Sequence, residues 1–379
     1  MTETPTMATK LYPVNETHTL SMRDLLDYFT RHGSMRVSDL HLKVGCPPVY
    51  RIDGQMQRLK GPPLEKPIVA TLAKTLLTEL EWQTLDEERS VDSSYLSETM
   101  QFRLNVFHDN DGLVVAIRAL ESNPPPLEEI GFPNGVAEDI IKRQFGLVLV
   151  TGITGAGKST TIASLIHRIA ETRPCRIITL EDPIEYQLPS KQAIISQREV
   201  GRDVPSYEHG LRDCLREDPD VIFVGEMRDR DAASWTLTAA ETGHLVFSTL
   251  HTRDTRGTVT RILDFFPEGQ QDEVSNQLSL GLSHVLSQKL IPRADGSGRV
   301  VAMEILNNTY GVSNLIRLNK MEQIYTQLQS RTKDVPEERM MTLERCLARL
   351  VRTGAIAPLE AEKWANHRAA FLDELQQVQ

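Results

Sequence analysis

GITGAGKS, residues 152–159, fits the pattern G-x-x-x-x-G-K-[ST] of a phosphate-binding loop. An apolar β-type run over residues 147–150 leads into it, and residues 160–170 follow with apolar positions at helical spacing. A glycine-rich loop between a strand and a helix lets backbone N–H groups converge on a phosphate, because the helix N-terminus favours negative charge. The octamer therefore predicts a nucleotide-binding site in an α/β domain.

The residue types in the octamer indicate separate roles in phosphate and metal binding. We expect Lys158 to reach the β- and γ-phosphates and the Ser159 hydroxyl to bind Mg²⁺, so the predicted cofactors are ATP and Mg²⁺. Further nucleotide contacts are expected from Gly152, Thr154, Gly155, Ala156, Gly157 and Thr160. The alternative is a glycine-rich turn that binds nothing, which the surrounding strand–loop–helix pattern disfavours.

Composition places the chain among globular proteins. Its 379 residues exceed one average domain, 40% of them are hydrophobic, and 25% are charged. There is no run of 18 apolar residues to span a bilayer, and the polar N-terminus lacks a signal pattern, so we expect a cytoplasmic protein. The four cysteines form no C-x-x-C pair, so neither a zinc site nor a disulfide framework is indicated.

Net charge bears on possible partners. The formal charge of −10 argues against a broad electrostatic footprint for nucleic acid. The chain also has no basic stretch interleaved with aromatic residues for stacking bases. A motor acting on nucleic acid, such as a helicase, therefore stays the weaker alternative, and we expect no nucleic-acid partner.

The order of patterns along the chain divides it into segments. A small α+β domain is expected because an amphipathic helical start precedes strand-like runs that end in a hairpin, and three consecutive prolines then favour an extended linker. Strand-like and helical runs alternate next, as in a parallel α/β core, before the pattern becomes helical. The predicted segments are a disordered tail (1–18), an α+β domain (19–122), a Pro-rich linker (123–133), an α/β core (134–298) and a helical C-terminal region (299–379).

Acidic residues follow two strand-like runs of the core. Residues 176–181 lead into a cluster of carboxylates that includes Glu185, and residues 221–224 lead into Glu226. Ligands of open α/β sheets bind at the carboxyl ends of the strands. The second run has a Walker B arrangement with glycine in the usual aspartate position, so Glu226 is the expected Mg²⁺ ligand.

Histidines and arginines supply further candidates. His244 and His251 bracket one strand-like run, and we expect His251 at the same sheet edge as Glu185 and Glu226, near the γ-phosphate. Arg103 and Arg118 lie on the predicted hairpin, and arginines commonly stabilise the charge that develops during phosphoryl transfer. Structural histidines and solvated arginines are the alternatives, and residue type alone leaves the choice open.

Together these segments resemble the secretion-superfamily ATPases, and most closely the PilT/PilU family of type IV pilus retraction ATPases. The four motifs are the phosphate loop, the two acidic strand ends and the strand bracketed by histidines, and their order is more specific than any one of them. The resemblance covers about two thirds of the chain, counted over the matching segments. The segments that carry it are residues 38–42, 152–161, 178–185, 197–200, 215–221, 225–229, 239–244 and 265–267.

This resemblance implies a fold and an assembly. It implies a PAS-like N-terminal domain, a RecA-like P-loop NTPase domain, and a homohexameric ring that binds ATP between neighbouring subunits. Glu185 matches the general base, Glu226 the Mg²⁺ glutamate, and His244 and His251 the histidines that link the γ-phosphate to domain position. Arg103 and Arg118 match arginines that approach the nucleotide, although Gln101 stands where the family often has another arginine.

The implied function is pilus retraction (twitching motility) at the cytoplasmic face of the inner membrane. The implied partners are an inner-membrane pilus platform protein and a paralogous motor, with membrane association only through partners. Residues 311–317 lack an arginine that many retraction ATPases carry, and the 295–299 insertion and long C-terminal tail resemble PilU. The alternatives are therefore an accessory ring that supports another motor, a pilus extension ATPase, or a type II secretion ATPase.

Overall fold

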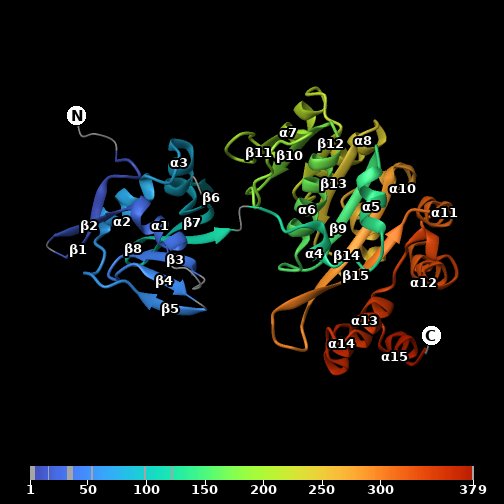
Figure 1. The fold of residues 1–379 in the computed structure, drawn as a ribbon. Coiled ribbons are helices and arrows are strands. Elements are labelled where there is room, and N and C mark those ends of the chain that lie inside the picture. Colours follow the sequence, from blue (N-terminus) through green and yellow to red (C-terminus); the bar gives the residue numbers. More distant parts are fainter. Residues whose placement is uncertain are drawn as a thin grey trace. The chain divides into compact units, whose positions relative to one another are not determined.

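The computed structural model describes residues 5–15, 17–31, 37–52, 54–97, 100–120 and 123–377 (Figure 1). Its contacts divide the chain into two compact units. The first comprises Met1–Asn123 with Pro183–Gln187, and the second comprises Pro124–Asp182 with Leu188–Gln379.

The first unit is an antiparallel sheet with helices, which agrees with the predicted α+β class. Its six-stranded sheet has the order β5-β4-β3-β8-β7-β6. The strands are β3 (Val37–Lys43), β4 (Val49–Ile52), β5 (Gln55–Arg58), β6 (Ser90–Leu96), β7 (Gln101–Asp109) and β8 (Gly112–Leu120). The helices are α1 (Met22–Arg31), α2 (Lys66–Lys74) and α3 (Glu79–Glu88).

Local sequence explains these elements. Strands β3, β7 and β8 alternate buried and accessible residues, so Leu40, Leu104 and Ile117 form one apolar face that packs in the core. The Asp109 carboxylate accepts the backbone N–H groups of Asp111 and Gly112 and so closes the hairpin.

The prediction of a disordered tail over residues 1–18 is wrong for part of that range. Lys10–Asn15 forms β1, which pairs antiparallel with β2 (His18–Ser21). The reason is Tyr12, which is completely buried and whose hydroxyl donates to the Pro62 carbonyl at 2.8 Å. Residues 1–4 and Glu16 lie outside the described residues.

A seven-stranded sheet forms the centre of the second unit and confirms the predicted α/β class (Figure 1). Its order is β11-β10-β12-β13-β9-β14-β15, and all neighbours are parallel except β14 and β15. The strands are β9 (Gly146–Thr151), β10 (Arg176–Glu181), β11 (Ile194–Glu199), β12 (Val221–Val224), β13 (Leu245–Leu250), β14 (Leu282–Pro292) and β15 (Arg299–Asn307).

Helices cover this sheet, as its continuous apolar strands require. Every residue of β9 and β13 is buried, and α6 and α8 both pack against these two strands. The helices of this core are α4 (Leu127–Ile130), α5 (Val136–Lys142), α6 (Lys158–Thr172), α7 (Tyr207–Cys214), α8 (Arg230–Glu241), α9 (Thr255–Leu263) and α10 (Glu268–Gly281).

Two predicted boundaries of the second unit are corrected. Residues 299–307 were expected in the helical region but form β15, because this apolar run is buried in the sheet and such a run has no distinctive period. Part of the expected linker, 123–133, instead packs on α6. Ser164 there donates to the Pro125 carbonyl at 2.7 Å, and Leu127 is buried.

The C-terminal region is helical from Tyr310, as expected beyond β15 (Figure 1, orange and red). Its helices are α11 (Tyr310–Arg317), α12 (Ile324–Asp334), α13 (Leu343–Arg352), α14 (Pro358–Trp364) and α15 (Arg368–Gln376). Among the described residues, no helix combines the length and the apolar character needed to cross a bilayer.

Candidate active site

The glycine-rich loop connects β9 to α6 at the carboxyl edge of the parallel sheet. Gly155 and Gly157 have φ angles of +77° and +85°, in the left-handed region that side chains with a Cβ rarely adopt. Helix α6 then begins at Lys158. The loop thus delivers the backbone N–H groups of the first helical turn to one place, as phosphate binding requires.

Lys158 folds back over this loop. Its side chain is 9% exposed, and its ammonium donates to the carbonyls of Gly152 at 2.9 Å and Ile153 at 3.3 Å. It also lies 3.5 Å from Nδ1 of His251. The positive charge is therefore held at the mouth of the loop, where a phosphate would compete for the same N–H donors.

Strand register brings His251 and Glu226 to this edge. Leu250 on β13 is paired with Thr151 on β9, so His251 follows directly beside the start of the loop. Glu226 follows β12, and the next residue's backbone N–H donates to the Thr249 carbonyl at 3.2 Å. Parallel pairing alone thus brings two predicted site residues next to the loop.

Polar contacts join these side chains into one cluster. Oε1 of Glu226 lies 3.2 Å from Nε2 of His251, whose Nδ1 faces Lys158. A neutral imidazole with its proton on Nε2 satisfies both contacts, because it donates to the carboxylate and accepts from the ammonium. His251 therefore connects the lysine at the phosphate loop to the carboxylate at the end of β12.

Arg228 extends the cluster and was not among the predicted site residues. Its Nε donates to Glu226 at 2.9 Å and its guanidinium to Asp182 at 3.0 Å. The hydrogen bond to Glu226 raises the pKa of Arg228 above its usual range. The one sequence signal for this role is the position of Arg228 two residues after Glu226. That signal is weak, because a solvated arginine near acidic residues can have the same spacing from them.

His244 lies at the opposite end of β13 from His251. Its ring is 3.0 Å from the Ala239 carbonyl and 3.2 Å from the Thr242 hydroxyl. Within the second unit, therefore, His244 does not join the cluster around Lys158. A nucleotide contact by His244 stays a prediction.

Glu185 belongs to Pro183–Gln187, the segment that groups with the first unit. The Gln101 side chain there donates to the Ile184 carbonyl and accepts from Nε2 of Gln187 at 3.3 Å. Gln101 thus holds the segment that carries Glu185. The role of Glu185 as a general base stays a prediction.

Arg103 and Arg118 are direct cross-strand neighbours on β7 and β8. Nε of Arg118 donates to Asp39 at 2.8 Å, and Arg51 lies 3.5 Å from the same carboxylate. Burial favours a raised pKa for Asp39, but the hydrogen bonds from Ser38 and Arg118 outweigh it and hold that pKa below its usual value. The structure thus places the predicted arginines side by side in the first unit.

A buried glutamate supports the start of α9, shortly after His251. Both the backbone N–H and the hydroxyl of Thr255 donate to Oε1 of Glu304 at 2.8 Å. Oε2 of Glu304 is buried without a hydrogen-bond partner among the described residues. Desolvation by burial raises the pKa of Glu304 to about 7.

This pKa predicts a pH dependence of stability. The folded-state pKa of Glu304 lies above the ordinary 4.5, so between these pH values unfolding releases a proton from Glu304. The contribution of protonated Glu304 to the free energy of unfolding is therefore complete below about pH 4.5 and is lost as the pH rises toward 7. The whole change corresponds to about 3 kcal/mol. Thermal unfolding from pH 5 to 8 should show a shallower decline for Glu304→Gln, and parallel curves would contradict this prediction.

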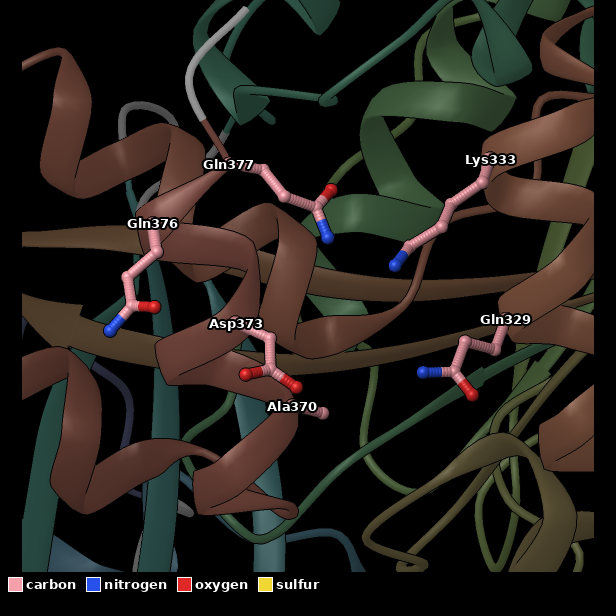
Figure 2. A pocket seen from close by; sticks show the side chains of 6 residues that line it. All are labelled: Gln329, Lys333, Ala370, Asp373, Gln376 and Gln377. Carbon is pink, nitrogen blue, oxygen red and sulfur yellow. The ribbon is translucent and has the colours of Figure 1, made fainter.

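A separate pocket of about 330 Å³ lies among the C-terminal helices (Figure 2). Its lining residues are Gln329, Lys333, Ala370, Asp373, Gln376 and Gln377. None of the predicted site residues lines it, and Lys333 is 3.2 Å from Oε1 of Glu374. The candidate active site is therefore the cluster around Lys158.

The loop, the parallel sheet and the acidic strand end define a P-loop nucleotide-binding protein. More particularly, the chain belongs to the Type II/IV secretion system protein family, whose model matches residues 34–371. The predicted family resemblance is confirmed. Among curated proteins, the type IV pilus retraction ATPase PilT of Pseudomonas aeruginosa is 40% identical over 348 residues, covering 92% of this chain and 98% of that protein.

Two further comparisons agree. The type IV pilus ATPase PilU of the same organism is 32% identical over 320 residues, covering 84% of this chain and 82% of that protein. A crystal structure of the pilus retraction motor PilT with bound ADP matches with a TM-score of 0.83 and 41% identity, covering 92% of this chain and 98% of the other.

Proposed function

We propose that this protein is an ATPase that powers the retraction of type IV pili. The observation that carries the proposal is the similarity to PilT over nearly the whole length of both proteins. The cluster around Lys158 supports it, because it supplies the phosphate loop, the lysine and the strand-end carboxylate that ATP hydrolysis needs.

ATP is the expected nucleotide, bound by the loop and the start of α6. The loop N–H groups and Lys158 would hold the phosphates. Nucleotide contacts are expected from residues 152–160 because these residues form the loop and the first turn of α6. His251 would link the γ-phosphate site to Glu226, because its Nδ1 faces Lys158 and its Nε2 contacts the Glu226 carboxylate. The crystal structure of PilT with ADP supports nucleotide binding here.

Mg²⁺ fits the donors at this edge. The Ser159 hydroxyl lies in the first turn of α6, and the Glu226 carboxylate follows β12. Both would be oxygen ligands of the kind that Mg²⁺ prefers. When bound, Mg²⁺ neutralises charge on the phosphates. The contacts of Glu226 with His251 and Arg228 would keep its carboxylate oriented.

The other predicted residues would act in an assembled ring. Glu185 would accept a proton from the attacking water, and Arg103 and Arg118 would approach the phosphates of a bound nucleotide. A homohexamer that binds ATP between subunits would also give His244 a neighbour to contact. Light scattering of the purified chain with nucleotide should give the mass of six copies.

The same family relationship supports a cellular location and binding partners for the ring. The ring would act in the cytoplasm at the inner-membrane base of the pilus, bound there through a platform protein. A principal rather than accessory motor is supported by the higher identity to PilT than to PilU, 40% against 32%. Residues 295–298 lie in the turn between β14 and β15 and Arg299 begins β15, so we give the insertion no weight in favour of the PilU role.

Deleting the gene in the source organism tests this function. Pili labelled on living cells should then extend but fail to retract, so that static pili accumulate. Cells without pili would instead indicate an extension motor, and unchanged retraction would indicate an accessory ring or an unrelated function.

A further inference from the structure

Gln288 lies beneath the phosphate loop and contacts it from β14. Its side chain is 1% exposed. Ser287, the preceding residue, pairs with Thr151 at the end of β9, so Gln288 reaches the level at which the loop begins. Gln288 therefore lies against the loop from the neighbouring strand.

The side-chain amide of Gln288 joins the loop to the helix. Its Nε2 donates to the Ala156 carbonyl at 2.7 Å, and its Oε1 accepts from the Thr161 hydroxyl at 3.1 Å. Since a carbonyl can only accept, Ala156 fixes the amide nitrogen on its side, and Thr161 then donates to the oxygen. One side chain thus satisfies a buried loop carbonyl and a buried hydroxyl of α6.

Gly152 and Gly157, the two glycines that the pattern G-x-x-x-x-G-K-[ST] requires, lie against the same residue. A Cβ on Gly152 would come within 2.4 Å of the Gln288 carbonyl oxygen. A Cβ on Gly157 would come within 3.3 Å of the Gln288 amide nitrogen. The close approach of loop and strand at Gln288 therefore favours glycine at both positions, in addition to their positive φ angles.

We propose that Gln288 is a positioning residue for nucleotide binding, because its amide holds the Ala156 carbonyl against the sheet and away from the phosphates. A backbone carbonyl turned toward a phosphate would repel it, whereas N–H groups attract it. The hydrogen bond to Thr161 fixes the amide in the orientation that this requires. The inference rests on the proposed binding of nucleotide at this loop.

Measuring ADP affinity in the full-length protein with Mg²⁺ tests the proposal. Gln288→Met keeps the length of the side chain but removes both hydrogen bonds, so we expect the affinity to fall by about 10-fold to 100-fold. Thr161→Val removes only the hydroxyl that orients the amide and should cost less. Thr236→Val is the matched control, since it removes a buried hydroxyl that bonds only within α8, to the Ala232 carbonyl.

Thermal unfolding separates positioning from general stability. For a positioning residue, the rise in Tm caused by ADP should shrink in Gln288→Met and in Thr161→Val, and should persist in Thr236→Val. Undiminished ADP affinity in Gln288→Met and Thr161→Val, with only a lower Tm without ligand, would overturn the proposal. If Gln288→Met fails to fold, Thr161→Val decides alone.

Lys158→Ala distinguishes failure of this inference from failure of the proposed function. If Lys158→Ala loses ADP affinity and Gln288→Met retains it, only the role of Gln288 is wrong. If Lys158→Ala also binds ADP as tightly as the unaltered protein, nucleotide binding at this loop is itself wrong.

Discussion

ATP hydrolysis should fall below detection when Lys158 is replaced by alanine. The ammonium is held at the mouth of the loop by two backbone carbonyls and is the cation nearest to the expected phosphates. Alanine removes the charge that would balance the β- and γ-phosphates, and no other group in the loop replaces it. Phosphate release from purified protein measures the effect.

The matched control for this variant is Lys191→Ala. Lys191 belongs to the same unit but is partly exposed and pairs with Glu171 at 2.7 Å. Such a surface pair contributes little, so turnover should be unchanged. An undiminished rate in Lys158→Ala would mean that this loop is not the site of hydrolysis.

Glu185→Gln should keep ATP binding and lose turnover. Glutamine has the size of glutamate but cannot accept a proton, and a general base contributes about 10²-fold to 10⁴-fold to rate. ATP affinity should stay within about twofold of the unaltered value, because the ground state does not use the proton transfer. Single-turnover hydrolysis and nucleotide titration measure the two quantities separately.

Glu217→Gln is the control for the glutamate substitution. Glu217 pairs with Arg198 at 2.8 Å, away from the cluster around Lys158, and should leave turnover unchanged. Near-normal turnover in Glu185→Gln would show that another group accepts the proton. Glu226, already bonded to His251, would then be the next carboxylate to replace.

Much of the second unit was predictable because its strands are buried on both faces. Apolar runs bounded by a glycine-rich loop or by acids revealed β9, β10, β12 and β13. Strand β15 was missed for the same reason, since a run buried in the sheet looks like a buried helix. β1 was missed because its anchor, Tyr12, depends on a distant carbonyl at Pro62.

The site was predictable only where chain order decides it. Lys158, Glu226 and His251 follow parallel strands, so the sheet brings them to one edge. Arg228 contacts Asp182 as well as the nearby Glu226, and Gln288 contacts Ala156, so both roles depend on a residue that is far away in the sequence. No local sequence pattern predicts such long-range contacts.

Retraction in cells that carry a single altered copy of the gene tests the central claim most directly. Labelled pili should retract when the deletion is complemented by the unaltered gene or by Lys191→Ala, and should stay extended when it is complemented by Lys158→Ala expressed at the same level. Retraction restored by Lys158→Ala would contradict the account, because hydrolysis at this loop would then not power the motor.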